Sequence, residues 1–403
     1  MSYTVLARRY RSQSFDDVVG QEAVARTLKN AIATGRVAHA YLFCGTRGVG
    51  KTSLARIFAR ALNAPDTIPD CPRPPKPRAE ERSDEAPDDF PDLDIQQRMA
   101  DAIMRGEDLN VIEIDGASNN SVEQARQLIA NAGLSPTANA HHKVYIIDEV
   151  HMLSGAAFNA LLKTMEEPPP HVKFILCTTE PHKVPATIQS RCQRFDFRNI
   201  PTRAIAEHLR QVLDKEGIEA EDEAVFQLAV LGNGSMRDAL SLTDRLIATG
   251  ESKLTSKTLE DMLGLPAQEL IAGFIDAVAA GDPKATLEAL ADLLDRGISQ
   301  DQLIEVLIAR LRQLMLINAC GPDSELIELS DEARRAAADQ AAKFDTAALV
   351  HMIALCENLQ RHAKNSNNPR ALLDATAVRL ALAEKMADVT AVLAGQTPAA
   401  APA

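Results

Sequence analysis

Eight residues near the N-terminus have the types and spacing of a phosphate-binding loop. Glycines in such a loop let backbone N–H groups converge on phosphate oxygens, and the start of the following helix adds its positive dipole end. The matching residues, in the pattern G-x-x-x-x-G-K-S/T, are Gly45, Thr46, Arg47, Gly48, Val49, Gly50, Lys51 and Thr52. We expect Lys51 to reach the β- and γ-phosphates, Thr52 to ligate Mg²⁺, and Ser53 to join the nucleotide site. A glycine-rich turn without a ligand is the alternative.

Two adjacent acids, Asp148 and Glu149, end an apolar segment that starts at Lys143. At the carboxyl end of a strand, Asp148 is placed to hold Mg²⁺ and its water shell, and Glu149 to polarise an attacking water. A small-molecule kinase needs no such base, because its substrate supplies the hydroxyl. The pair therefore favours hydrolysis, although two acids at a strand end can also be a simple polar loop.

Two threonines and two arginines further along the chain could complete a hydrolytic site. Thr178 and Thr179 end the next apolar segment, where a hydroxyl can help to hold the attacking water. Arg191 lies in a Ser-Arg-Cys sequence, and Arg237 is close to the start of a helical pattern. The planar, permanently charged guanidinium binds phosphate oxygens in pairs. For either arginine alone, a surface salt bridge is the commoner explanation.

The elements that must position these residues alternate between strands and helices from Ala40 to about Phe197. The segment 52–63 has apolar residues at helical spacing on one face. Four short apolar runs predict buried strands, at 40–44, 111–114, 144–147 and 174–177. Strands that alternate with helices predict a parallel sheet covered on both faces. From about Pro201 the strand signals stop, and amphipathic helices follow to about Asp388.

The chain has 403 residues, and at about 150 residues per domain this length favours two or three domains. We expect an α/β core over 1–198, a small helical unit over 199–249, a larger helical unit over 250–388, and a flexible tail over 389–403. The stretch 64–92 is rich in proline and acids and nearly free of large apolar side chains. Such a stretch buries too little surface to offset its ordering entropy, so we expect an exposed, mobile insertion.

Composition excludes several classes of protein. Apolar residues make up 46% and charged residues 25%, the mix of an ordinary globular protein. No uncharged apolar run approaches the length of a membrane-spanning helix, and the first residues do not resemble a secretory signal. Six scattered cysteines form no disulfide framework, so we expect a cytoplasmic protein. A net charge of −13 argues against a protein that binds nucleic acid non-specifically over its whole surface. It does not exclude a local basic patch.

Seven segments in order resemble the gamma/tau subunit family of bacterial DNA polymerase III clamp loaders, which are AAA+ ATPases. They read YTVLARRYRSQSFDDVVGQ, GTRGVGKTS, VIEIDGASNNSVEQAR, KVYIIDEVHMLSGAAFNALLKTMEEPP, VKFILCTTEP, SRCQRFDF and GSMRDALSLTDRLI. The resemblance is close over 1–250 and loose over 250–380. It implies an α/β P-loop AAA+ core with a parallel sheet, then a small helical lid domain, then an all-α collar domain.

The resemblance also implies roles for individual residues. Lys51, Thr52, Asp148 and Glu149 take the phosphate, Mg²⁺ and water-activating roles, and Thr179 (or Thr178) takes the sensor position. Arg191 corresponds to a finger that acts on ATP bound by the neighbouring subunit, and Arg237 to the sensor of its own subunit's ATP. Residues in the adenine-packing segment are Ala7, Tyr10, Val18 and Val19. Residues facing DNA phosphates in the central channel are Asn119, Asn120, Ser121 and Lys163.

The implied function is an ATP- and Mg²⁺-dependent motor that opens a sliding clamp and loads it onto primer–template DNA. The implied partners are other clamp-loader subunits in a pentameric ring, the clamp, and, for a longer product, the polymerase core and the replicative helicase. The whole assembly is a DNA-directed DNA polymerase, a nucleotidyltransferase. A catalytically silent loader subunit is one alternative, but such subunits lose the lysine or the acid pair. A hexameric branch-migration motor is another, but it lacks the Ser-Arg-Cys motif and a collar-sized helical region.

The sequence departs from the family at two places. Relatives usually carry four cysteines after the phosphate-loop helix as a zinc module. Here Ala64 replaces the first of these, and Cys71 is the only cysteine in the insertion. Zinc needs three or four protein ligands, so we expect no zinc site. Ser12 stands where the family usually has proline, which should loosen the N-terminal arm without touching the chemistry.

Overall fold

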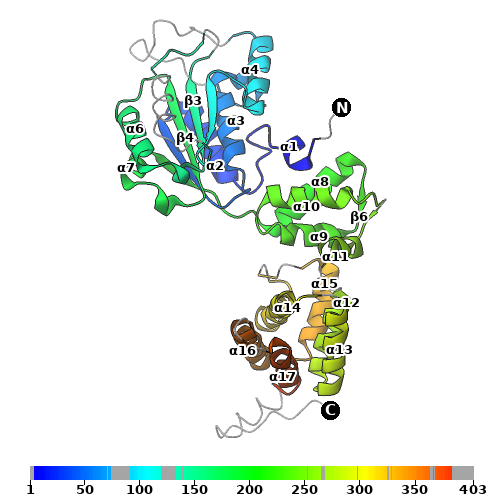
Figure 1. Cartoon of the computed structure of the whole chain (residues 1–403). Coiled ribbons are helices and arrows are strands. Elements are labelled where there is room, and N and C mark those ends of the chain that lie inside the picture. The colour runs from blue at the N-terminus through cyan, green and yellow to red at the C-terminus, as the bar shows by residue number, and fades with distance from the viewer. Residues whose placement is uncertain are drawn as a thin grey trace. The chain divides into compact units, whose positions relative to one another are not determined.

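The computed structural model describes residues 4–383, apart from positions 70, 74–90, 119–132, 138–139, 252, 265–267, 297, 325, 328, 364–365 and 367. The chain divides into two compact units, Met1–Lys215 with Leu228–Arg245 and Glu216–Gln227 with Leu246–Ala403 (Figure 1). The domain boundaries expected at 198, 249 and 388 stay predictions. No single helix among the described residues has the length and apolar composition needed to cross a membrane.

The first unit is built on a five-stranded parallel sheet with the strand order β2-β3-β4-β1-β5. Its strands are β1 (Ala40–Cys44), β2 (Val111–Asp115), β3 (Lys143–Asp148), β4 (Val172–Thr178) and β5 (Gln193–Asp196). All residues of β1 and β4 are buried, as expected for central strands covered on both faces. Each of the four predicted strands is present. The edge strand β5 was not predicted, because its polar residues form no apolar run.

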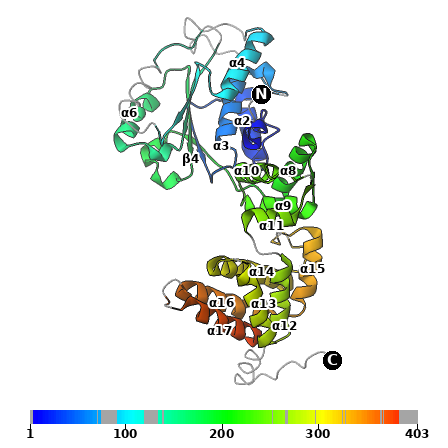
Figure 2. The same ribbon diagram turned by 45° about the vertical axis from the view of Figure 1, so that its right-hand side comes forward.

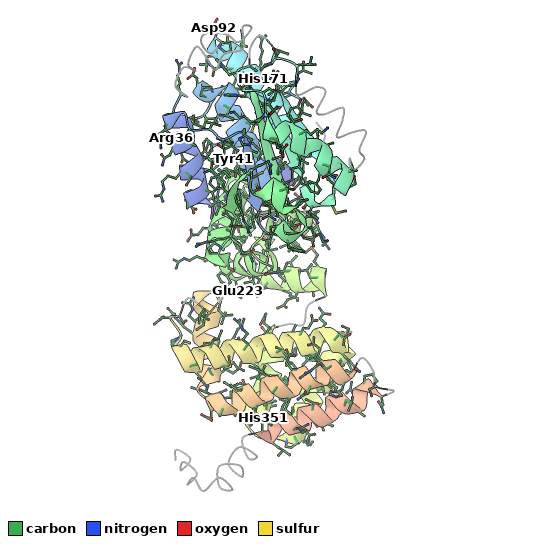
Figure 3. All side chains as sticks on the ribbon, turned by 90° about the vertical axis from the view of Figure 1, so that its left-hand side faces the viewer. Arg36, Tyr41, Asp92, His171, Glu223 and His351 are labelled. Carbon is green, nitrogen blue, oxygen red and sulfur yellow. The ribbon has the colours of Figure 1, made fainter. Side chains whose placement is uncertain are left out.

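Helices cover both faces of this sheet (Figures 1 and 2). Successive strand residues point to opposite faces, so Tyr41 and Phe43 belong to one buried cluster while Leu42 belongs to the other. On the first face lie α2 (Glu22–Thr34), α3 (Lys51–Asn63) and α4 (Leu93–Arg105), and on the second lie α6 (Gly155–Glu166) and α7 (Ala186–Gln189). Tyr41, which is fully buried, lies inside this layered core (Figure 3).

The N-terminal segment and two later helices complete the first unit. These elements are α1 (Leu6–Arg9), α8 (Thr202–Glu216) and α10 (Met236–Ile247). The backbone N–H of Leu6 donates to Asp244 Oδ1 on α10 at 3.3 Å. The Gln21 side chain exchanges hydrogen bonds with the backbone of Arg198 just after β5, at 2.7 and 3.3 Å. The two contacts hold the N-terminal segment beside the parts of the chain that follow the sheet.

The stretch expected to be an exposed insertion begins inside the core. Ala64 is fully buried and Ile68 is 3% exposed, with the short helix η1 (Pro65–Thr67) between them. Arg60 closes this turn, because its guanidinium donates to the side chain and the carbonyl oxygen of Thr67. Cys71 packs on the same apolar cluster. The expectation of exposure is therefore wrong for Ala64, Pro65 and Ile68, whereas Asp66 is exposed. Most of the remaining insertion, 74–90, lies outside the described residues.

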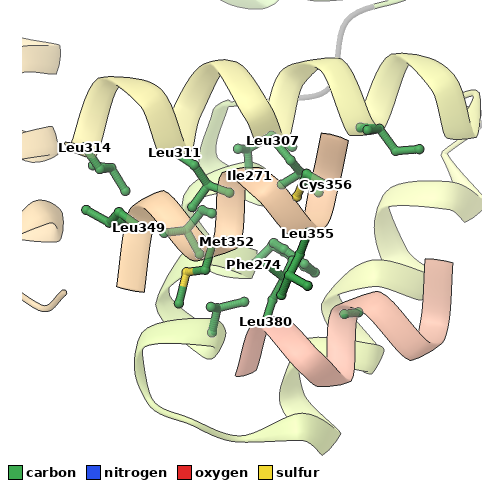
Figure 4. Close-up of a cluster of buried hydrophobic side chains, with 14 of the residues drawn as sticks. Ile271, Phe274, Leu307, Leu311, Leu314, Leu349, Met352, Leu355, Cys356 and Leu380 are labelled. Carbon is green, nitrogen blue, oxygen red and sulfur yellow. The ribbon is translucent and has the colours of Figure 1, made fainter. Parts of the chain in front are cut away.

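The second unit is almost entirely helical. Its described elements are β6 (Glu219–Ala220), α9 (Asp222–Leu231, in which the division between the units falls), β7 (Lys253–Leu254), α11 (Ser256–Leu263), α12 (Gln268–Ala279), α13 (Pro283–Asp295), α14 (Gln300–Cys320), α15 (Asp331–Ala341), α16 (Thr346–Ala363) and α17 (Pro369–Ala381). Leu307, Leu311 and Leu314 recur on one face of α14 and pack against Leu349 and Met352 of α16 (Figure 4). The parallel pair β6–β7 was not predicted, because two-residue strands leave no apolar pattern.

All six cysteines are free thiols, and all of them are described. Burial raises the pKa of five: Cys44, Cys71, Cys177, Cys192 and Cys356. The pKa is about 11 for Cys71 and about 12 for Cys192 and Cys356. Cys320, at the end of α14, is exposed.

Candidate nucleotide-binding site

The predicted phosphate loop connects β1 to α3, which is the placement that its chemistry requires. Gly48 has φ +76°, a left-handed conformation that favours glycine. A Cβ at Gly48 would lie 1.8 Å from Ser235 Oγ and 2.9 Å from Ser235 Cβ, so the loop runs against the start of α10 without room for a side chain. Gly50, with φ +97°, precedes the first residue of α3. The backbone therefore forms the cradle that a phosphate group needs.

The Lys51 ammonium is held by the loop itself. Its Nζ donates to the carbonyl oxygens of Gly45 at 2.8 Å and Thr46 at 2.7 Å. The residue is 6% exposed, and burial lowers the pKa of its ammonium group. No carboxylate within the described residues forms a salt bridge with Lys51. A cation bound only by carbonyl groups at the mouth of a phosphate loop is suited to an anionic ligand.

The two expected magnesium ligands are in contact. Thr52 Oγ1 donates to Asp148 Oδ2 at 2.6 Å, which joins the start of α3 to the end of β3. Among the described residues no group of three or more His, Cys, Asp or Glu side chains could hold a metal ion. Mg²⁺ in nucleotide sites takes one or two protein oxygens, with phosphate and water oxygens completing its octahedron. The hydroxyl and the carboxylate thus fit a Mg²⁺–nucleotide complex better than a metal held by protein alone.

Glu149 meets a threonine from the neighbouring strand. Glu149 has φ +44°, which is left-handed and uncommon for a residue with a side chain. Thr179 Oγ1 donates to Glu149 Oε2 at 3.1 Å. Thr178 is fully buried, and its hydroxyl oxygen accepts a hydrogen bond from the backbone N–H of Glu180. Of the two threonines that the sequence left open, Thr179 is the one in contact with Glu149.

A cavity of about 720 Å³ lies in front of the loop and the acid pair, within the first unit. This volume is within the usual range for small-molecule and cofactor sites. The expected residues that line it are Ala7, Tyr10, Val18, Val19, Arg47, Gly48, Val49, Gly50, Lys51, Thr52, Ser53, Asp148, Glu149 and Arg237. The structure thus brings together residues predicted from four separate parts of the chain, including the proposed adenine-packing segment.

Several lining residues were missed by sequence reasoning, among them Arg11, His208 and Leu240. Arg11 belongs to the basic run that begins at Arg8, a signal that was present but not specific. Burial, together with the nearby Arg56 guanidinium, lowers the pKa of Arg11, although the Glu113 and Asp148 carboxylates act in the opposite direction. His208 and Leu240 lie on helices whose orientation toward the loop depends on packing, so no local pattern identifies them.

Other expected residues do not line the cavity. Gly45, Thr46 and Thr179 act through hydrogen bonds to Lys51 and Glu149. Arg191 instead forms an ion pair with Glu166 at 2.7 Å and donates to the Thr187 carbonyl oxygen at 2.7 Å, with its side chain 33% exposed.

The expected DNA-facing residues lie elsewhere in the chain. Lys163 is exposed on α6. Asn119, Asn120 and Ser121 lie outside the described residues.

The parallel sheet, the phosphate loop and the paired oxygen ligands define a P-loop nucleotide-binding protein. Three family models match successive parts of the chain: DNA polymerase III, delta subunit (residues 20–201); DNA polymerase III clamp loader subunit, ATPase lid domain (204–252); and DNA polymerase III subunits gamma and tau domain III (254–394). The chain belongs to the gamma/tau subunit family of DNA polymerase III. Its fold is an AAA+ core followed by a lid domain and an all-helical domain.

Individual relatives support this assignment. DNA polymerase III subunit tau of Bacillus subtilis is 39% identical over 94% of this chain and 63% of its own length. The tau subunit of Escherichia coli is 40% identical over 82% of this chain and 48% of its own length. The gamma subunit of Buchnera aphidicola is 38% identical over 79% of this chain and 81% of its own length. The chain thus spans about half to two thirds of the tau relatives that it matches.

One solved structure, the Thermotoga maritima RuvB Holliday junction branch migration motor, is also similar. It has a TM-score of 0.44 and 18% identity, over 67% of this chain and 79% of that one. This likeness is too slight to bear on function.

Proposed function

We propose that this chain is an ATP-hydrolysing motor subunit of a DNA polymerase III clamp loader, which opens a sliding clamp and loads it onto primer–template DNA. The observation that carries the proposal is the convergence on one cavity of Lys51, the Thr52–Asp148 pair at 2.6 Å and Glu149, whose carboxylate accepts a hydrogen bond from Thr179 at 3.1 Å. Because the chain belongs to this family, we propose the clamp and the other loader subunits as its partners. We assign nucleotide transfer to other subunits of the polymerase and not to this chain.

In this proposal each polar group has a separate task. Lys51 exchanges its two carbonyl partners for β- and γ-phosphate oxygens, and Arg237 binds the γ-phosphate from α10. Thr52 and Asp148 would hold Mg²⁺, which when bound would supply positive charge next to the phosphates. Glu149 accepts a proton from the attacking water, while the Thr179 hydroxyl fixes the carboxylate through a hydrogen bond. Ala7, Tyr10, Val18 and Val19 provide the surface on which the adenine packs.

The assembly part of the proposal rests on Arg191. This residue does not line the cavity of its own chain, and its guanidinium contacts Glu166 and the Thr187 carbonyl oxygen instead. We propose that in a pentameric ring it acts on ATP bound by the neighbouring subunit. Lys163 and the residues at 119–121 would then contact the DNA backbone in the channel. The competing explanation is that the Arg191–Glu166 pair only stabilises the fold.

The test is ATP hydrolysis by loaders reconstituted with their partner subunits, the clamp and primer–template DNA. Arg191→Ala should bind ATP through its intact loop but lose stimulated hydrolysis, by about 10³–10⁵-fold if the finger contributes as it does in GTPases. Mixing Arg191→Ala with Lys51→Ala subunits should restore some activity, because an intact loop then meets an intact finger.

Glu166→Gln is the matched control, since it removes the ion pair but leaves the arginine. Activity close to that of the unsubstituted loader supports the trans role. A loss equal to that of Arg191→Ala, with no recovery on mixing, would assign Arg191 to structure alone.

A further inference from the structure

The imidazole of His151 lies between two carboxylates at the rear of the proposed hydrolytic site. His151 belongs to the short helix η3 (Val150–Met152) that follows Glu149, and its side chain is 6% exposed. Its Nδ1 lies 3.0 Å from Thr178 Oγ1 and 3.4 Å from Glu149 Oε2. Its Nε2 lies 3.1 Å from Glu180 Oε2. The ring does not line the nucleotide cavity, so its role is separate from nucleotide binding.

The local backbone holds the ring in this place. The left-handed conformation of Glu149 turns the chain sharply at the end of β3, and the Met152 N–H closes the turn on the Glu149 carbonyl at 2.9 Å. Thr178 Oγ1, which contacts the same nitrogen Nδ1 as Glu149 does, is fixed because it also accepts the Glu180 N–H at 3.0 Å. Nδ1 has Thr178 and Glu149 as polar neighbours and Nε2 has Glu180, so rotation of the ring would break contacts at both ends.

The far side of the ring reaches a surface turn. The Glu180 carboxylate also binds Lys183 Nζ, at 2.9 and 3.0 Å, and the hydrogen bond from Lys183 lowers the pKa of this carboxyl group. Lys183 ends the short helix η4 (Pro181–Lys183). Gln189 of α7 donates to the carbonyl oxygens of Pro181 at 3.0 Å and Val184 at 2.8 Å, which ties this turn to α7. A continuous chain of contacts therefore leads from α7 through η4 and Glu180 to His151.

We propose that His151 is a positioning residue for Glu149: its ring links the Glu149 carboxylate to Glu180, so that movement of the η4 turn changes the orientation of the group that activates water. The proposal rests on the proposed ATP hydrolysis and deepens it by naming what controls Glu149. Thr179 supplies one hydrogen bond to the Glu149 carboxylate. Without the His151 ring that single hydrogen bond does not fix the orientation of the carboxylate, so the Glu149 side chain can change its rotamer. The loss should appear in kcat, because His151 does not line the cavity proposed to bind the nucleotide.

The experiment measures ATP affinity, kcat and KM of the assembled loader with substituted subunits. His151→Ala should lower kcat by about 10²-fold, the effect of misplacing a catalytic group by an ångström, with ATP affinity within about twofold of the unsubstituted subunit. His151→Asn retains a group near the Nδ1 position, and His151→Gln retains one near Nε2. Both should give intermediate rates, because each keeps only one of the two ends of the link.

Two further variants test the link itself. Glu180→Gln weakens the outer end and should lower kcat, and in the His151→Ala background it should add little, since both changes break the same link. His182→Gln is the matched control: His182 also lies near Glu180, at 3.8 Å, but its side chain is 73% exposed. It should leave kcat unchanged. Equal losses from His182→Gln and Glu180→Gln, or additive effects in the double variant, would overturn the proposal.

Failure of the positioning role can be distinguished from failure of the proposed function. If the His151→Ala loader hydrolyses ATP as fast as the unsubstituted loader, the positioning role is refuted and the proposed function is not. A loader that hydrolyses no ATP refutes the proposed function. In that case a crystal structure of His151→Ala decides the positioning role: a Glu149 carboxylate still at the Thr179 hydroxyl contradicts it, and a rotated carboxylate supports it.

Discussion

Gly48→Ala should lower the free energy of unfolding of the first unit by more than the cost of placing alanine in a left-handed backbone conformation. Placing alanine at φ +76° costs about 1–2 kcal/mol of the free energy of unfolding. The added methyl group would also lie 1.8 Å from Ser235 Oγ and 2.9 Å from Ser235 Cβ, and overpacking of this kind costs about 1–3 kcal/mol. The expected total is therefore about 2–5 kcal/mol.

Two variants separate these contributions. Gly106→Ala is the matched control, because Gly106 has φ +78° in the same unit and its nearest neighbour to a new Cβ is 3.4 Å away. It should lose only the backbone part, about 1–2 kcal/mol. Ser235→Gly removes both close atoms and costs α10 only a few tenths of a kcal/mol at its start. Gly48→Ala combined with Ser235→Gly should therefore approach the loss seen in Gly106→Ala.

The assay is urea unfolding followed by circular dichroism, with the transition of the first unit compared among the variants. Equal losses in Gly48→Ala and Gly106→Ala, within about 0.5 kcal/mol, would refute the close approach of the phosphate loop to α10. A double variant no more stable than Gly48→Ala would show that another contact, and not Ser235, opposes the methyl group.

Three other outcomes are expected. Lys51→Ala should abolish ATP binding or hydrolysis while circular dichroism shows an unchanged fold, and normal turnover with DNA and clamp would contradict its phosphate role. Glu149→Gln should bind ATP and clamp but turn over very slowly, whereas a loss of affinity as severe as in Lys51→Ala would make Glu149 structural. Burial lowers the pKa of His142 from 6.5 to about 3, so the unfolded chain binds more protons between these values and stability should fall as pH falls through them. His142→Gln should reduce that slope by up to about 1.4 kcal/mol per pH unit in urea unfolding, and an unchanged slope would show that His142 binds a proton as readily in the folded protein as in the unfolded chain.

Buried strands and local motifs were predictable because their signals lie in consecutive residues. The run Val172–Thr178 is apolar throughout most of its length, as a strand covered on both faces must be. The edge strand β5 carries Gln193, Arg194 and Asp196, which face outward and give no such run. The phosphate loop was recognisable for a similar reason, since its glycines, lysine and threonine are adjacent in the chain.

Contacts between distant segments were not predictable. Which of Thr178 and Thr179 meets Glu149 depends on which face of β4 is buried, and that is decided by the helices packed on the sheet. The link from His151 to Glu180 joins two turns that follow different strands, so no spacing in the sequence indicates it. The burial of Ala64 and Ile68 likewise depends on Arg60, whose side chain closes the turn from the preceding helix.

The distribution of thiols makes the chain suited to site-selective chemical labelling without prior mutagenesis. Maleimides react with the thiolate, and burial raises the pKa of the other five thiols, of which Cys44, Cys177 and Cys356 are buried and Cys71 and Cys192 are partly buried. Cys320 alone is exposed. At neutral pH a single fluorophore should therefore attach at the end of α14, in the helical unit, far along the sequence from the phosphate loop. Changes in its emission on addition of the proposed partner subunits would test for ring assembly in real time, while the proposed ATPase residues keep their natural side chains.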